Sequence, residues 1–156
     1  MQREMMKVDV AEVYSPERVV KEARQHGLRP GFSPDLTSYD DRGMPWDFNR
    51  KEMRDKAKRL IEEQQPSLLI GSPMCTNWSS IQNLNWDKMS KEEVERRMTE
   101  AKLHLRFVVE LYKLQHEAGR YFVHGHPWTA TSWRQPCVQE MMRTAGVQVA
   151  KGDMCV

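Results

Sequence analysis

The sequence has no hydrophobic run long enough to cross a membrane. Its uninterrupted apolar runs extend over only a few residues, whereas a membrane-spanning helix needs about 20. Residues 1–10 also lack the apolar stretch of a signal peptide. These two absences predict a chain without a membrane partner, in an intracellular compartment that is either cytoplasmic or nuclear.

Cysteine is scarce as well. The three cysteines, Cys75, Cys137 and Cys155, form an odd set without a Cys-x-x-Cys pair. That pattern argues against a disulfide framework and against a structural zinc site built from cysteine pairs. We therefore expect free thiols.

No charge sign dominates, because 24 basic residues face 22 acidic ones and the net charge is +2. Such a weak overall field neither requires nor excludes a nucleic-acid partner. A length of 156 residues fits one domain that can bury a core of its own.

Segments typical of strands alternate along the chain with segments typical of helices. This order predicts an α/β fold: a Rossmann-like three-layer sandwich with a mostly parallel five-stranded sheet and helices on both faces, formed by one domain over residues 1–156. The chain ends shortly after the last expected strand, so we expect a fragment of a longer polypeptide. The expected strands are 8–14, 31–37, 68–70, 120–123 and 147–150, and the expected helices are 15–27, 50–65, 90–118 and 131–145.

Several helix ends carry recognisable signals. Ser15 before Pro16 is typical of an N-cap followed by a first-turn proline, and Ser90 with Glu93 is typical of a capping box. Gly119 follows the longest expected helix and is suited to its C-terminal end.

In a parallel sheet, the loops that follow the strands share one edge, where ligands of open sheets bind. Tyr14, Ser15, Asp35 and the loops 72–79 and 124–127 should therefore converge there. The loop 72–79 follows the apolar segment LLI and presents one thiol, Cys75. The loop 124–127 presents His124 and His126.

The segment GSPMCTNWS resembles the nucleophile loop of cytosine-5 DNA methyltransferases, Gly-x-Pro-Pro-Cys-x-x-(aromatic)-Ser. It matches this motif at every defined position except Met74. The resemblance implies a Rossmann-like domain that uses S-adenosylmethionine, with Cys75 as the nucleophile that adds to C6 of a flipped cytosine.

The same resemblance implies a set of cofactor contacts. Asp35 matches the acidic position after the second strand, Asp47 in PWDF the next acidic motif, and Pro73 the loop proline. Tyr14 and Ser15 stand in the first loop, which is rich in glycine in the family and reads YSPERV here.

The family's catalytic glutamate has no counterpart here. In HGHPW, Gly125 stands where that glutamate is expected, and a positioned acid contributes about 10²–10⁴-fold in rate. We expect a weak or inactive methyltransferase unless His124 or His126 replaces the carboxyl group.

A second similarity extends over nearly the whole chain. The strings EVYSPERV, LLIGSPMCTNWS and GRYFVHGHP resemble a segment of retrotransposon polyproteins of unicellular eukaryotes, in which typical members have Glu between the two histidines. This resemblance implies a methyltransferase-like module of a polyprotein, with other parts of that polyprotein and DNA or RNA as partners. The alternative is a non-catalytic module on the same fold that binds nucleic acid or protein.

Each candidate residue also has a plainer interpretation. Cys75 suits a small buried apolar position, and Cys75, His124 and His126 suit a zinc site as a third alternative. His104 and His116 are expected on the solvated side of a helix. The tryptophans of the expected strand-end loops are either stacking platforms for bases or loop anchors in the core, namely Trp78, Trp86, Trp128 and Trp133. The basic residues of 50–59 alternate with acids, as on a solvated helix face.

Overall fold

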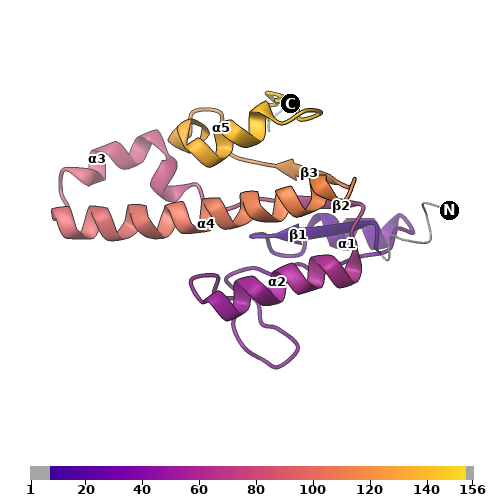
Figure 1. Cartoon of the computed structure of the whole chain (residues 1–156). Helices are drawn as coiled ribbons and strands as arrows, with labels where there is room; N and C mark the ends of the chain where they lie inside the picture. Colours follow the sequence, from indigo (N-terminus) through magenta and orange to yellow (C-terminus); the bar gives the residue numbers. More distant parts are fainter. Residues whose placement is uncertain (1–7, 154–156) are drawn as a thin grey trace.

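The computed structural model describes residues 8–153. Its centre is a parallel sheet of three strands in the order β1 (Val10–Val13), β2 (Leu68–Gly71) and β3 (Tyr121–His124) (Figure 1). The register aligns Val13 with Gly71 and Gly71 with His124. All three strands therefore end at one edge of the sheet, as the strand-end argument requires.

The α/β class is confirmed, but the expected five-stranded sheet is wrong. Residues 31–34 do run parallel to β1, since the amides of Glu12 and Tyr14 donate to the carbonyls of Phe32 and Pro34, both at 3.0 Å. The segment forms only an isolated bridge at Pro30, because proline lacks the N–H that a strand ladder needs. Residues 147–150 form no strand either.

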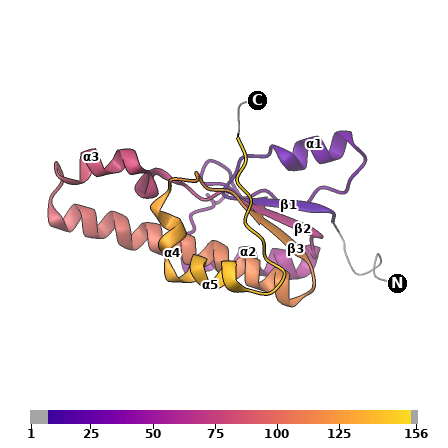
Figure 2. The ribbon, with the colours of Figure 1, turned by 90° about the horizontal axis from the view of Figure 1, so that it is seen from above.

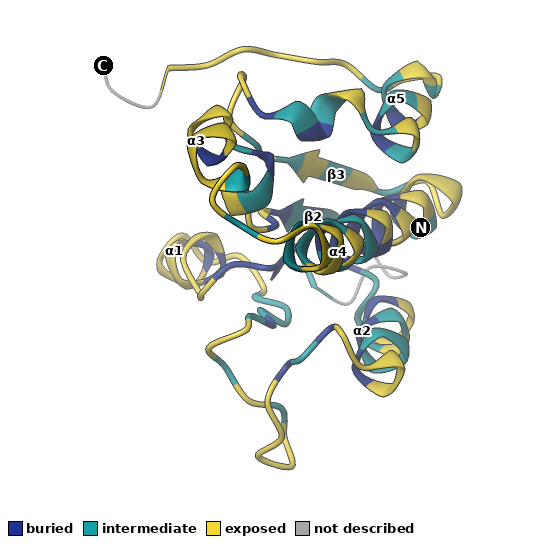
Figure 3. Ribbon diagram, turned by 90° about the vertical axis from the view of Figure 1, so that its left-hand side faces the viewer, coloured by how far each residue is buried: buried dark blue, intermediate teal, exposed yellow. Residues whose placement is uncertain are grey.

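Helices cover both faces of the sheet, although unevenly (Figure 3). Helix α1 (Val19–Gln25) packs on one face through a small cluster with Val10 and the half-buried Leu68 and Ile70. The other face carries the main core, to which α2 (Lys51–Gln64), α4 (Lys91–Glu117) and α5 (Pro136–Arg143) contribute. No described helix is both long and apolar enough to cross a membrane.

Helix α4 is the longest element and extends past the sheet. Its beginning and the short helix α3 (Asn83–Trp86) form an arm beyond the carboxyl edge (Figures 1 and 2). The predicted capping box is confirmed, since the Ser90 hydroxyl accepts a hydrogen bond from the Glu93 amide at 3.2 Å. Gly119 follows the helix with φ of +72°, a left-handed conformation that costs glycine little.

The predicted cap of α1 is wrong. Ser15 lies outside the helix, and a carboxylate from β1 takes over its expected role. Glu12 is 1% exposed and accepts hydrogen bonds from the amides of Arg18, Val19 and Val20 at 3.0–3.1 Å. A buried anion suits this position because the first amides of a helix lack partners and carry partial positive charge. The first turn of α1 is thus closed by the chain's own side chain.

This arrangement predicts that Glu12→Ala lowers the free energy of unfolding by about 2–3 kcal/mol, because it leaves three amides without an acceptor. Glu12→Gln keeps one carbonyl oxygen and should lose about half as much. Urea unfolding measures both. The control is Glu22→Ala on the exposed side of α1; equal losses at positions 12 and 22 would contradict the capping role.

Candidate functional site at the carboxyl edge of the sheet

Cys75 lies in the loop that leaves β2, as the strand-end argument predicted. The chain continues past Pro73 into η2 (Thr76–Trp78), and the Cys75 carbonyl accepts a hydrogen bond from the Trp78 amide at 2.9 Å. Trp78 is 2% exposed and fixes the loop to the core, whereas Cys75 is half-buried and Met74 is 50% exposed. The thiol is therefore partly accessible on a well-anchored loop.

His126 joins this loop to the one that follows β3. Its Nε2 lies 2.9 Å from the Pro73 carbonyl, which can only accept, so Nε2 carries the proton. Nδ1 then accepts from the hydroxyl of Ser132, at 2.5 Å. Burial lowers the pKa of His126. Both ring nitrogens of this neutral histidine are occupied in holding the two loops together.

His124 pairs with a tyrosine beneath it. The hydroxyl of the fully buried Tyr112 lies 2.8 Å from His124 Nδ1. Burial raises the pKa of Tyr112, so the hydroxyl keeps its proton and donates it to Nδ1. Burial, with a smaller contribution from nearby His126, lowers the pKa of His124 to about 3. His124 is thus neutral, and its Nε2 has no hydrogen-bond partner.

Helix α4 carries a second tyrosine–histidine pair that the sequence analysis missed. His104 is 5% exposed, so its expected place on a solvated face is wrong. Its Nδ1 lies 2.8 Å from the hydroxyl of Tyr14, the residue that follows β1. The available signal was its place beside Ala101, Leu105 and Val108 on the apolar stripe of the helix.

Of the five expected cofactor contacts, two are used inside the protein. Tyr14 is buried against His104, and the Ser15 hydroxyl donates to Glu12 and to the Pro16 carbonyl at 3.4 and 3.0 Å. Tyr14 adopts φ of +59°, the left-handed conformation for which the family's loop uses glycine. This loop therefore does not fit a close approach by S-adenosylmethionine.

The other three expected contacts lie in separate settings. Asp35 accepts a hydrogen bond from the Thr37 hydroxyl and lines an open cavity of about 340 Å³ with Pro16. Asp47 accepts from the Asn49 amide at 3.0 Å and stabilises a turn. The Pro73 carbonyl is held by His126. Of these three residues, Asp35 is the one that lines the cavity beside Pro16.

The described residues offer no metal site. No group of three or more His, Cys, Asp or Glu side chains among residues 8–153 is placed to hold an ion. His126 has no free nitrogen, which argues against zinc held by Cys75, His124 and His126. Cys137 is a free thiol like Cys75, and Cys155 lies outside the described residues.

Gly125 lies beside the Cys75 loop. Its amide donates to the Gly71 carbonyl at 3.0 Å. A Cβ atom built on Gly125 would have the Ser72 hydroxyl at 3.8 Å as its nearest neighbour, an ordinary contact. The position where the family has glutamate therefore has room for a side chain.

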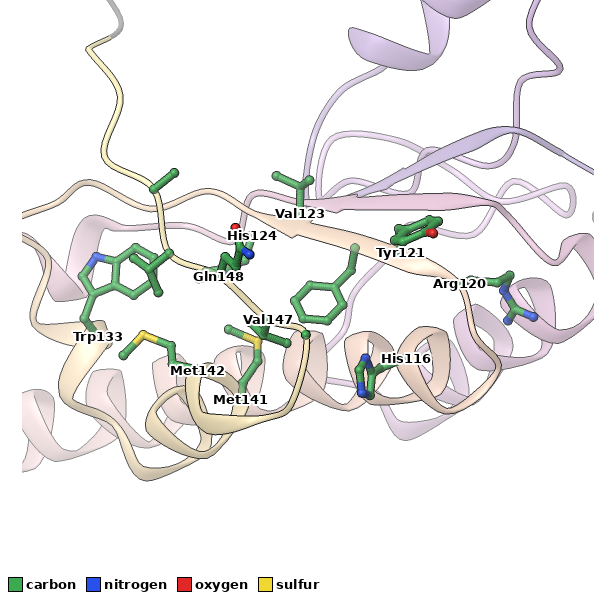
Figure 4. Close-up of a pocket in the computed structure, with 14 residues that line it drawn as sticks. His116, Arg120, Tyr121, Val123, His124, Trp133, Met141, Met142, Val147 and Gln148 are labelled. Atoms are coloured by element: carbon green, nitrogen blue, oxygen red, sulfur yellow. The ribbon is translucent and has the colours of Figure 1, made fainter.

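A cavity of about 330 Å³ separates β3 from the chain after α5 (Figure 4). It is lined by His124 from β3, by Trp133 and Met141, and by Val147 and Gln148 from the chain after α5. The segment expected as a fifth strand therefore passes near β3 without pairing with it.

The remaining aromatic and basic candidates mostly follow their plainer interpretations. Trp78 is a core anchor, and the indole of Trp133 donates to the Pro127 carbonyl at 2.8 Å. Trp128 is 57% exposed, with the Lys151 ammonium 5.4 Å from its ring. On α2, ion pairs join Lys51 to Asp55 and Lys58 to Glu110, as on a solvated face.

Comparison with protein-family models, with curated proteins and with solved structures found no match for this chain. The two resemblances stated above therefore remain hypotheses, and the case for a function depends on the geometry of the carboxyl edge.

Gly71 should tolerate no larger residue. A Cβ there would lie 1.9 Å from the Tyr112 hydroxyl oxygen and 2.7 Å from the ring carbon that carries it. Gly71→Ala should lower the free energy of unfolding by about 3 kcal/mol, the upper range for overpacking. Gly125→Ala, with room for its methyl group, is the matched control in urea unfolding. Equal stability of the two variants would show that Tyr112 does not fill this position.

Acid should destabilise the protein through its neutral histidines. Folding lowers the pKa of His124 from 6.5 to about 3. Between pH 6.5 and pH 3, His124 therefore binds a proton in the unfolded chain but not in the folded chain. Stability is complete above pH 6.5 and decreases as the pH falls, by about 2 kcal/mol from this residue between pH 6.5 and pH 5.

Urea unfolding at a series of pH values tests this. His124→Gln gives Tyr112 an acceptor that cannot titrate and should flatten the profile over this range. His26→Gln, at an exposed position, should leave the profile unchanged. A His124→Gln profile as steep as that of the unmodified chain would contradict the assignment.

Proposed function

We propose that this chain is a degenerate cytosine-5 DNA methyltransferase-like domain of a retrotransposon polyprotein. In this proposal Cys75 keeps the capacity to add to a pyrimidine base, while S-adenosylmethionine-dependent transfer is weak or absent. The proposed setting is intracellular, cytoplasmic or nuclear, with DNA or RNA and other parts of the polyprotein as partners.

One observation carries the proposal. The loop that bears the partly accessible Cys75 and the loop that bears Gly125 meet at the carboxyl edge. The Gly125 amide bonds the Gly71 carbonyl at 3.0 Å, and His126 holds the Pro73 carbonyl at 2.9 Å. The two loops that carry the positions assigned by the resemblance to the nucleophile and to the acid are thus hydrogen-bonded to each other, although about 50 residues separate these positions in the sequence.

The proposed addition can be written at Cys75 without a cofactor. The thiol gives its proton to solvent, and the thiolate Sγ bonds to C6 of the pyrimidine. The π electrons of the C5–C6 bond shift to C4–C5, and those of the C4–N3 bond shift to N3, which takes up one proton. A glutamic acid at position 125 would supply that proton, whereas here water must do so.

The same geometry explains why methyl transfer should be poor. His124 and His126 are neutral because burial lowers their pKa, and a neutral imidazole does not release its N–H proton as a carboxylic acid does, so neither replaces the acid. The Glu12 carboxylate occupies the first turn of α1, and Tyr14 is buried in the loop that should wrap the cofactor. These features disfavour S-adenosylmethionine more than they disfavour a base at Cys75.

A specific observation favours the alternative of a non-catalytic interaction module. Large apolar side chains are exposed in the Cys75 loop, just before α3 and in α3: Met74 is 50%, Ile81 71% and Leu84 72% exposed. Grouped exposed apolar side chains mark interaction surfaces. A module of this kind would bind its partner without Cys75.

A covalent trap separates the two functions. We expect a DNA oligonucleotide with one 2-pyrimidinone base in place of cytosine to form an adduct with the protein, visible by denaturing electrophoresis and mass spectrometry. The adduct should disappear in Cys75→Ala. Gly125→Glu should form it about 10²-fold faster or more, because a positioned acid then protonates N3.

Cys137→Ala is the matched thiol control, since burial raises the pKa of Cys137; it should react like the unmodified chain. Calorimetric titration with S-adenosylmethionine should give no heat at roughly millimolar ligand. Heat that disappears in Asp35→Ala would instead establish a cofactor site and contradict this expectation. Failure of both the unmodified chain and Gly125→Glu to form the adduct would refute the nucleophile. DNA binding that persists in Cys75→Ala without an adduct would establish the interaction module instead.

A further inference from the structure

A second cavity, of about 300 Å³, lies between the Cys75 loop and the first half of α4. The loop contributes the polar side chains of Thr76 and Asn77. Helix α4 contributes four polar or charged side chains, those of Arg96, Arg97, Glu100 and His104. The apolar part of the lining comes from both elements, namely from Pro73 and Met74 in the loop and from Ala101 and Leu105 in the helix. The cavity is therefore part apolar wall and part hydrogen-bonding wall, as small-molecule sites are.

His104 lines this cavity and has an unsatisfied nitrogen buried behind its wall. Burial raises the pKa of Tyr14, so its hydroxyl keeps its proton. That hydroxyl lies 2.8 Å from His104 Nδ1 and donates its proton to this nitrogen. The neutral ring then carries its own proton on Nε2, which is buried and has no partner. Leaving such a donor unpaired costs about 1–3 kcal/mol.

An acceptor stands close to this donor without bonding it. Glu100 Oε1 lies 3.9 Å from His104 Nε2, beyond hydrogen-bond distance. The Glu100 side chain is 41% exposed and has room to change rotamer. Oε1 also accepts from the Asn49 amide group at 3.1 Å, which leaves it further lone-pair capacity. His104 and Glu100 therefore present a donor and an acceptor side by side.

The charges around the cavity nearly cancel. Arg96 and Arg97 both bond Glu93, at 2.8–3.1 Å, and Arg96 lies 3.9 Å from Glu100. Two guanidinium groups thus face two carboxylates, and His104 is neutral because burial lowers its pKa. This balance favours a neutral polar ligand over a phosphate group.

We propose that this cavity binds a nucleobase through an amidine edge, a ring nitrogen that accepts beside an exocyclic amino group that donates. Because His104 Nε2 is buried, binding includes a change in the rotamer of Glu100, whose Oε1 lies 3.9 Å from it, that opens Nε2 to the cavity. The ring nitrogen then accepts from His104 Nε2, and the amino group donates to Glu100 Oε1. Cytosine and adenine have this edge. Uracil and hypoxanthine present a ring N–H beside a carbonyl oxygen, the reverse order. The apolar wall contacts the ring.

This inference rests on the proposed function only in placing a base beside the Cys75 loop, because the binding needs no covalent step. Cytidine stands for a base of nucleic acid, and adenosine stands for the base of an adenine-containing co-substrate. The two sources share the amidine edge, and the comparison of their affinities distinguishes them.

The test is titration of the full chain with cytidine, adenosine, uridine and inosine, followed by calorimetry and by NMR of the α4 amides. We expect cytidine or adenosine to bind at least about tenfold more tightly than uridine and inosine, the equivalent of one hydrogen bond of about 1.4 kcal/mol. Glu100→Ala should remove that preference. Glu95→Ala, an exposed position on α4 outside the cavity, should not.

Tyr14→Phe provides a readout that a merely structural role would not move. Without the hydroxyl, His104 is free to place its proton on either nitrogen, so the preference for the amidine edge should fall while uridine binding improves. Equal affinities for all four nucleosides, or no binding of any, would overturn the inference. Nucleoside binding should persist in Cys75→Ala. Nucleoside binding without any covalent adduct would contradict the proposed function alone, and adduct formation without nucleoside binding would contradict this site alone.

Discussion

The close approach of Tyr112 to Gly71 is the contact on which the carboxyl edge depends. Gly71 lacks a Cβ atom, and the Tyr112 hydroxyl occupies the space a Cβ would take. From there it reaches His124 at the end of β3. The ring of His124 lies 5.0 Å from that of His126, which holds the Pro73 carbonyl. The position of Cys75 is thus determined by a chain of contacts that begins in the core.

Helix α4 holds this edge in place through hydrogen bonds to residues at the ends of two strands. His104 and Tyr112 are eight residues apart and so lie on one face of the helix; one reaches the end of β1 and the other the end of β3. Each takes part in a tyrosine–histidine hydrogen bond of 2.8 Å. In both pairs burial keeps the phenol protonated and the imidazole neutral. The same physics therefore leaves an unpaired Nε2 proton near each of two cavities.

Periodicity and strand-end logic predicted the elements that depend on local pattern. The three strands of the sheet, helices α2 and α4, and the contact between the loops that follow β2 and β3 were predicted from apolar spacing and from the parallel topology. The fifth strand at 147–150 failed because short apolar segments carry no information about pairing. The cap of α1 failed because Glu12 satisfies it from six to eight residues away, through the fold of the strand-to-helix turn. His104 failed because helix position alone does not reveal a buried tyrosine from another element.

The two departures from the methyltransferase pattern differ in physical kind. At Gly125 a side chain is missing and a Cβ atom can be added without a clash, so one substitution can test whether the acid restores reactivity. At the first loop, Glu12, Tyr14 and Ser15 are buried and hydrogen-bonded to one another or to α1 and α4. Opening that loop for a cofactor would break several buried hydrogen bonds, each worth about 1 kcal/mol or more. If the proposed function is right, fewer changes are therefore needed to restore the reactivity of Cys75 than to restore cofactor binding. A base that reaches the carboxyl edge should accordingly be bound more readily than it is methylated.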